Sequence, residues 1–227
     1  MKLVAILVAL AAAAQIADAD LEKMRDRQDK AGLEQSIAML SAESRKKSSD
    51  ASIQYRLALA NHYLAEVALE ENDRARAREA AETGVRAAEQ AIALKPASAE
   101  YHRIRGTLCG QVIPANVLAG LRYGRCAMDE INKALELDPK SAKVWMSKGV
   151  GNYYLPPAFG GGVELAIQDF QKALQLDPRL ADAHLWLGIA LRKANRPAEA
   201  RRALEKAVEL NPRRVWAVKQ LGKTPGK

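Results

Sequence analysis

Alternating segments rich in Val, Ile and Thr, which are typical of β-strands, are missing from this sequence. Aromatic residues make up only 5% of the 227 residues, whereas 48% are hydrophobic and alanine is abundant. Alanine, leucine, lysine, arginine and glutamate are strong helix formers. The composition therefore predicts an all-α protein with enough apolar side chains to form a core.

Motifs that carry catalysis or hold metals are also absent. The chain has no H-E-x-x-H or C-x-x-C motif, no Walker loop and no G-x-S-x-G. The glycine run "FGGG" lacks the Lys-Ser/Thr pair that follows in a phosphate-binding loop. His62 is isolated, and His102 and His184 occupy equivalent places where another copy of an internal repeat has Trp145, which indicates packing positions. We therefore expect no enzyme, no cofactor and no metal site.

No hydrophobic run reaches the roughly 20 residues that span a bilayer. The longest run, "LVAILVALAAAA" at 3–14, has 12 residues, follows Lys2 and precedes "ADA" at 17–19. A positive residue, a short apolar core and a small-x-small site are typical of a cleaved signal peptide. We predict a signal peptide over 1–19 that is cut after Ala19, a periplasmic or secreted location, and no stable membrane anchor.

The formal net charge of +8 is compatible with a nucleic-acid or anionic membrane partner. The basic residues, however, are mixed with acids, as in "ENDRARAREAAE" and "RRALEKAVELNP". Such mixing is typical of a solvated helix face. An exported protein also seldom meets nucleic acid, so we expect no nucleic-acid partner.

Four segments of the chain end alike: "AEQAIALKP", "INKALELDP", "FQKALQLDP" and "LEKAVELNP". An alanine stands five residues before each final proline, and a glycine or alanine stands twelve before it. Small residues at helical spacing let a second helix approach closely, and a proline ends the helix. The prolines are Pro96, Pro139, Pro178 and Pro212.

The last copy, "HLWLGIALRKANRPAEARRALEKAVELNP", carries Leu187-Gly188, Ala200, Leu204 and Pro212. It resembles the tetratricopeptide repeat, whose pattern is W-x2-L-G-x2-Y, then A-x3-F, then P. The resemblance implies a right-handed helical solenoid of about four helix pairs plus capping helices. We expect the solenoid to cover 51–222 and to end in a cap that begins at "VWAVKQLG". A capping region at 20–50, with a lone helix at 33–40, precedes it. A flexible tail at 223–227 follows it.

Two of the units are longer than the 34-residue family period. Successive prolines lie 43, 39 and 34 residues apart, which leaves excesses of 9 and 5 residues. We place them in the turns between paired helices, at 110–124 and 153–162. In "YYLPPAFGGG", the prolines should end one helix near Tyr154, and the glycines free the backbone before the next helix at Val163. The two turns are expected to lie side by side, either folded over their own helix ends or walling a ligand pocket.

The only two cysteines, Cys109 and Cys126, flank the 9-residue excess. In an oxidising compartment they form a disulfide that closes a loop of about 17 residues. The alternative is two buried, unpaired thiols that act as small apolar side chains. The sequence leaves both possibilities open.

In the tetratricopeptide family, a second stripe of side chains beside the packing stripe lines a concave groove where partners bind. In this chain that stripe would give the groove an apolar floor and basic rims. The alternative for each of these residues is that it packs between adjacent units and does not face the groove. The candidate ligand- or partner-binding residues, with those of the enlarged turn, are Arg103, Lys143, Met146, Val150, Tyr153, Tyr154, Phe159, Leu185, Ile189 and Arg192.

The enlarged turns also resemble those of periplasmic tetratricopeptide proteins that accompany TRAP-type transporters. That resemblance implies a cavity for a small ligand, and oligomerisation is compatible with it. We therefore expect a non-enzymatic binding or scaffold protein that takes a small ligand or a transporter partner between the concave face and the enlarged turns. The alternative is a protein-interaction adaptor for cell-envelope assembly that holds peptides in the groove. An enclosed pocket would favour the first, and an open groove the second.

Overall fold

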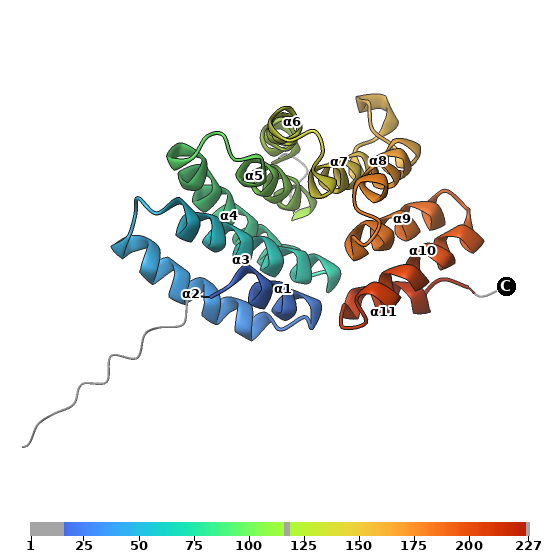
Figure 1. Cartoon of the computed structure of the whole chain (residues 1–227), viewed down its shortest axis with the longest axis horizontal. Coiled ribbons are helices and arrows are strands. Elements are labelled where there is room, and N and C mark those ends of the chain that lie inside the picture. The colour runs from blue at the N-terminus through green and yellow to red at the C-terminus, as the bar shows by residue number, and fades with distance from the viewer. Residues whose placement is uncertain (1–15, 116–118, 226–227) are drawn as a thin grey trace, which may run out of the picture.

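The computed structural model describes residues 16–115 and 119–225, and this part of the chain contains helices and no strand (Figure 1). Most of the predicted signal peptide, residues 1–15, lies outside the described residues. The elements are α1 (Asp18–Asp26), α2 (Lys30–Lys46), α3 (Ala51–Glu70), α4 (Arg74–Leu94), α5 (Ala99–Val112), the 3-10 turn η1 (Ile113–Ala115), α6 (Ala119–Leu137), α7 (Ala142–Tyr154), the 3-10 turn η2 (Pro157–Phe159), α8 (Val163–Leu176), α9 (Ala181–Lys193), α10 (Pro197–Leu210) and α11 (Val215–Gly222).

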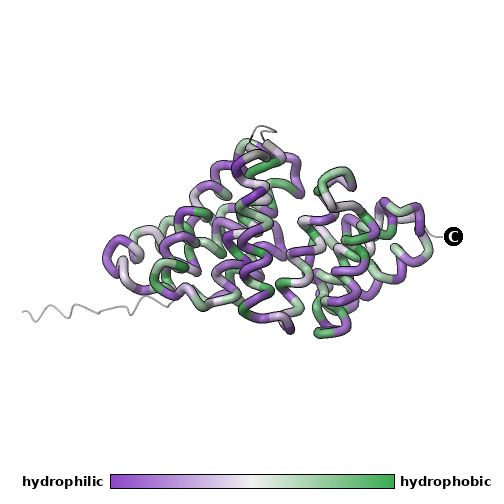
Figure 2. Tube along the Cα trace, turned by 90° about the horizontal axis from the view of Figure 1, so that it is seen from above, coloured by the Kyte–Doolittle hydropathy of each residue, from purple (hydrophilic) through white to green (hydrophobic). Residues whose placement is uncertain are grey.

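The predicted all-α fold is confirmed. Helices α3 to α10 pack as four successive antiparallel pairs, which follow one another along a curved array (Figure 1). Figure 2 shows hydrophilic and hydrophobic residues alternating along the helices, as expected where each helix buries one side. The second helix of every pair ends two residues before a repeat proline, at Leu94, Leu137, Leu176 and Leu210.

Three of these prolines are followed, six residues later, by a histidine or tryptophan. The side-chain ring of that residue has a hydrogen-bonding role that the repeat pattern alone did not reveal. His102 Nε2 lies 2.9 Å from the carbonyl oxygen of Pro96, Trp145 Nε1 donates to that of Pro139, and His184 Nε2 lies 3.0 Å from that of Pro178. Each of these rings can donate an N–H to the proline carbonyl in the turn that follows the helix. Histidine and tryptophan are therefore interchangeable here because both carry a ring donor.

The turns between paired helices differ in length. In the pairs α3/α4 and α9/α10 the turn has three residues, with Asn72 and Asn195 in the left-handed conformation. The α7/α8 turn runs from 155 to 162, so its length agrees with the predicted 5-residue excess. Of the insert predicted at 110–124, residues 116–118 lie outside the described residues; η1 covers 113–115, and much of the 9-residue excess lengthens α6 to 19 residues.

The turn at 155–162 is ordered and closed by backbone hydrogen bonds. Gly162 donates to the carbonyl of Asn152, and Gly161 to that of Pro156. Gly160 and Gly162 have φ values of 84° and 120°, which residues with a side chain rarely adopt. The predicted helix end at Tyr154 and restart at Val163 are thereby confirmed.

Both ends of the array differ in detail from the prediction. The N-terminal region holds two helices, α1 and α2, where a lone helix at 33–40 was expected. At the other end Thr224, within the segment expected to be a flexible tail, is only 2% exposed. Arg192 Nη1 donates to Thr224 Oγ1 and Arg201 Nη1 to the Thr224 carbonyl, so residues 223–225 are held against α9 and α10.

Candidate functional site: an aromatic edge beside a buried ionic network

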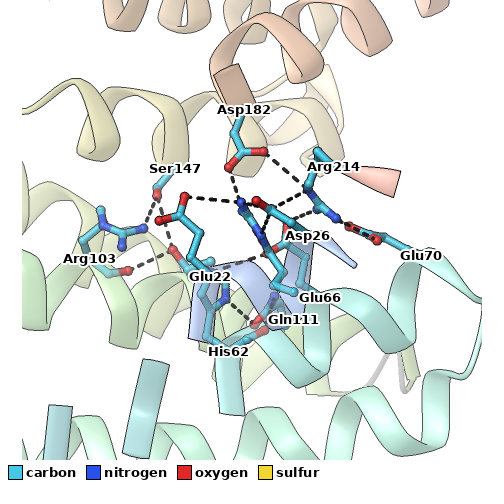
Figure 3. Close-up of polar contacts among 12 residues, drawn as sticks. Glu22, Asp26, His62, Glu66, Glu70, Arg103, Gln111, Ser147, Asp182 and Arg214 are labelled. Atoms are coloured by element: carbon cyan, nitrogen blue, oxygen red, sulfur yellow. Dashed lines mark hydrogen bonds and ion pairs between the residues drawn. The ribbon is translucent and has the colours of Figure 1, made fainter. Parts of the chain in front are cut away.

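A buried network of charged side chains joins the N-terminal helices to the last helix pair (Figure 3). At its centre is Arg214, which directly precedes α11 and is 1% exposed. Its Nη2 donates to Glu66 Oε1 at 2.9 Å and to Glu70, and its Nη1 donates to Glu70 Oε2 at 3.2 Å. Both glutamates belong to α3, so the contact links residues 144 and 148 positions apart in the sequence.

Arg25 of α1 makes the second bridge. Its Nη1 donates to Asp182 Oδ2 of α9 at 2.6 Å, and its Nε and Nη2 donate to Asp26 Oδ1. Asp26 also accepts a hydrogen bond from Asn211 Nδ2 at 2.7 Å. Helices α1 and α3 are thus tied to α9 and to the α10–α11 connection by charge-assisted hydrogen bonds.

The network shifts the pKa values of its members. Burial raises the pKa of the Glu70 carboxyl to about 7; Arg214 acts in the opposite direction, and Glu66 adds to the rise. Burial would also raise the pKa of Asp182, but Arg25 and Arg214 hold it below its usual value. Burial lowers the pKa of His62, whose Nδ1 lies 3.1 Å from Gln111 Oε1.

Arg103, predicted to lie on the rim of an open groove, is buried instead. Its Nε and Nη2 donate to the two Glu100 oxygens, both at 2.7 Å, and its Nη1 donates to Ser147 Oγ at 3.2 Å. The central part of the concave face is therefore filled by the chain's own side chains. A peptide bound there would have to displace paired charges, which is costly.

An edge-to-face cluster of aromatic rings lies beside this network, and we call it the aromatic edge: Tyr153, Tyr154, Trp186 and Trp216. The ring centroids of Tyr153 and Tyr154 are 5.0 Å apart, those of Tyr154 and Trp186 6.1 Å, and those of Trp186 and Trp216 5.2 Å. These rings come from the end of α7, from α9 and from the start of α11. Four aromatic residues from three different helices thus contact one another on one part of the array.

Two large apolar side chains, one in this cluster and one in the turn that follows α7, remain in solvent. Tyr154 is 65% exposed and Phe159, in the enlarged turn just after α7, is 73% exposed. Tyr153 is half-buried, and Lys193 Nζ lies 4.3 Å from its ring centroid. Exposing Tyr154 at the end of α7 and Phe159 in the turn adds nothing to the stability of the fold, so this surface is a candidate for covering by a partner.

The remaining predicted residues divide into two groups. Leu185 and Ile189 are buried in the contact of α9 with α10 and α11, and Met146 and Val150 are half-buried against the core of the last two pairs. Arg192 is used to hold the C-terminal segment. The exposed candidates are Lys143, Tyr154 and Phe159, and Tyr153 is half-buried.

The structure has a cavity beside the first enlarged turn, but this cavity is not the predicted pocket shared by both turns. That cavity, of about 380 Å³, is lined from α4, α5 and α6 and takes no residue from 153–162. The α7/α8 turn instead projects its aromatic side chain into solvent. Cys109 and Cys126, which the sequence left open, form a disulfide between α5 and α6.

Sequence reasoning missed the ionic network and the two tryptophans. A signal for the network was present, because Glu66 and Glu70 are like charges at i, i+4 on a mostly apolar helix. Such a pair destabilises an isolated helix and therefore requires a cation from elsewhere. Nothing in the sequence identified Arg214 as that cation, since it stands beside Arg213 in a short connection.

Two further observations bear on function. Among residues 16–115 and 119–225, no helix is both long and apolar enough to cross a bilayer. The same residues contain no group of three or more His, Cys, Asp and Glu side chains arranged to hold a metal ion.

Comparisons with known proteins identify both halves of the array. Residues 15–155 match the family described as "Regulator of microtubule dynamics protein 1-3", and residues 163–221 match a tetratricopeptide repeat family. A comparison with curated proteins finds no match. Neither family is described as a TRAP-transport family. The resemblance to the periplasmic proteins that accompany TRAP-type transporters is therefore not supported.

Solved structures with the same fold cover almost the whole chain. TTC0263, a thermophilic TPR protein of Thermus thermophilus, is 15% identical with a TM-score of 0.62, over 92% of this chain and 98% of its own. The HusA haemophore of Porphyromonas gingivalis is 16% identical with a TM-score of 0.56, over 79% of this chain and 96% of its own. At such identities the likeness concerns the fold alone.

Proposed function

The chain belongs to the family described as regulator of microtubule dynamics protein 1-3 and continues as a tetratricopeptide array, and on that premise we propose that it is an exported, non-enzymatic adaptor. It binds a protein segment at the aromatic edge and the adjoining turn at 155–162. The observation that carries this proposal is the exposure of Tyr154, whose ring lies against Trp186, together with the exposure of Phe159 in the turn that follows.

The chemistry of this surface indicates a partner with apolar anchors. Aromatic side chains dominate binding energy at protein interfaces because they bury a large area at a small entropic cost. Tyr154 is backed by Tyr153 and Trp186, so it is positioned before a partner arrives. A short segment with aromatic or aliphatic side chains fits this surface better than a small polar ligand.

The small-ligand alternative has less support. The cavity beside the first enlarged turn is polar, and it shares no residue with the aromatic edge. The central groove is occupied by the ionic network, so it offers no apolar floor at Arg103. In the adaptor hypothesis, the partner therefore binds at one edge of the concave face, and internal contacts fill the centre of that face.

A selection of displayed peptides on the purified protein tests the site. We expect the selected peptides to carry aromatic or aliphatic anchors, and the double variant Tyr154→Ala/Phe159→Ala to bind them about 10- to 100-fold more weakly. Because both side chains are exposed, the melting temperature should change little. The matched control Leu94→Ala/Met128→Ala removes two exposed apolar side chains elsewhere and should bind normally. Equal binding by both double variants would rule out the aromatic edge as the site.

Export is supported by the positive residue, apolar core and "ADA" site of residues 2–19 and by the disulfide, which persists in oxidising compartments. A cut after Ala19 shortens α1 by two residues and removes the Ile16 carbonyl that accepts from Arg56 Nη1. Leu21, fully buried, remains to anchor the helix.

Full-length protein produced in a bacterium with a periplasm should yield a periplasmic form that begins at Asp20, as measured by intact mass. A chain that stays in the cytoplasm with Met1 would contradict export. In that case, binding to microtubules, which the family's description suggests, becomes the assay of choice.

A further inference from the structure

The disulfide forms part of the wall of a cavity. The cavity of about 380 Å³ is lined by both Cys109 and Cys126, together with side chains of α4, α5 and α6. Cys109 is fully buried, whereas Cys126 is half-buried. A small molecule in the cavity would therefore meet the sulfur of Cys126 from the more open side.

Three arginines line the same cavity: Arg86, Arg105 and Arg122. Arg105 is paired with Glu89 and Glu130, but its Nε is buried without a hydrogen-bond partner. Among the described residues, Arg86 donates only to the Thr83 hydroxyl, and the Arg122 guanidinium lies over the Tyr123 ring at 5.4 Å. Within the described part of the chain, neither Arg86 nor Arg122 has a carboxylate partner.

Both glutamates that line the cavity accept a hydrogen bond from an arginine, although Arg105 is shared between Glu89 and Glu130. Glu89 accepts from Arg105 Nη2 at 2.7 Å, and Glu82 accepts from Arg78 Nε at 2.9 Å. The unpaired cations therefore give the cavity a positive potential beside the disulfide. Such a potential concentrates anions and raises their rates of association.

We propose that this cavity is a thiol-exchange site, at which a small anionic thiol attacks the disulfide and becomes attached to Cys126. The incoming thiolate forms a new S–S bond with Cys126 Sγ, and the Cys109–Cys126 bond breaks. Its electron pair leaves on Cys109 Sγ as a thiolate, which then takes a proton from solvent. Attack of a second small thiol on the mixed disulfide would release Cys126 and leave both cysteines reduced, with the small thiol oxidised to its own disulfide.

The cationic residues decide which thiol reacts. A thiol that carries a second negative group can place that group near Arg86 and Arg122 while its sulfur reaches Cys126. A neutral thiol of the same size gains nothing from these residues. Exchange would release the covalent link between α5 and α6 without disturbing the ionic network or the aromatic edge, so it is independent of the proposed binding site.

The test compares 2-mercaptoethanesulfonate with 2-mercaptoethanol on the intact folded protein, at equal thiolate concentrations and low ionic strength. We expect the sulfonate to react about tenfold faster. Mass mapping after quenching should find the adduct on Cys126 and the alkylating agent on Cys109. Added salt should reduce the difference between the two thiols, since it screens the arginines.

Arg86→Gln/Arg122→Gln should bring the sulfonate rate down to that of mercaptoethanol and leave the neutral rate unchanged, which also shows that the variant is folded. The control Arg179→Gln/Arg202→Gln removes two exposed arginines elsewhere and should keep the preference. Equal rates for both thiols, an adduct on Cys109, or an equal effect of the control pair would overturn the proposal.

Discussion

Replacing Arg214 with alanine is expected to lower the free energy of unfolding by about 3–5 kcal/mol, because it leaves Glu70 buried without its cation and Glu66 with only the more distant Arg25. The measurement is chemical denaturation followed by circular dichroism at pH 7.5. Arg213→Ala, which removes the exposed neighbour, should cost almost nothing. A loss for Arg214→Ala no larger than that for Arg213→Ala would contradict the network.

The same variant has a defined pH dependence. The pKa of Glu70 is raised to about 7 from a usual value of 4.5, so its protonated form is favoured by folding. That contribution to stability is fully present below pH 4.5 and is lost as the pH rises through 7. At pH 5 the Glu70 carboxyl is protonated and uncharged, so removing its cation costs less. The loss of unfolding free energy caused by Arg214→Ala should therefore be smaller at pH 5 than at pH 7.5. Glu70→Gln combined with Arg214→Ala should likewise restore part of the stability at pH 7.5.

Gly188→Leu is the second substitution with a large expected effect. A Cβ atom at Gly188 would lie 2.5 Å from Leu204 Cγ and 3.0 Å from the Ala200 carbonyl oxygen. Because the second of these is backbone, helices α9 and α10 must separate, at a cost of about 1–3 kcal/mol or more. Thermal melts followed by circular dichroism measure this.

Gly151→Leu provides the matched control, since nothing lies within 4 Å of its Cβ position. It lies in helix α7, so leucine should raise stability by up to about 1 kcal/mol. A melt of Gly188→Leu that equals the wild type would show that the repeat register is wrong.

The sequence predicts the repeat register well because the register depends on local patterns. The spacing of small residues identifies the pair contact at Gly188 and Ala200, and each repeat proline marks a helix end two residues earlier. The turn at 155–162 follows from proline and glycine chemistry within ten residues. All of these features are decided by short stretches of chain.

The candidate site was harder to predict because it depends on the curvature of the array. Whether Leu185 and Ile189 face a groove or the next unit depends on the angle between successive pairs, and here they are buried. The partners of Glu66 lie in helix α1 and beside helix α11, at opposite ends of the sequence. No local sequence pattern indicates that these two ends of the chain are in contact.

The contact of Arg214 with α3 has a consequence for how the molecule unfolds. In an open repeat array each unit touches only its neighbours, so terminal units fray and stability is close to a sum of nearest-neighbour contributions. Here α1 and α3 are joined to α9 and to the segment that precedes α11 through Arg25, Asp26 and Arg214, so the array has no free end at which to begin fraying. The chain should behave thermodynamically as a closed ring, in which α1 and α11 exchange their amide protons only when the whole protein opens.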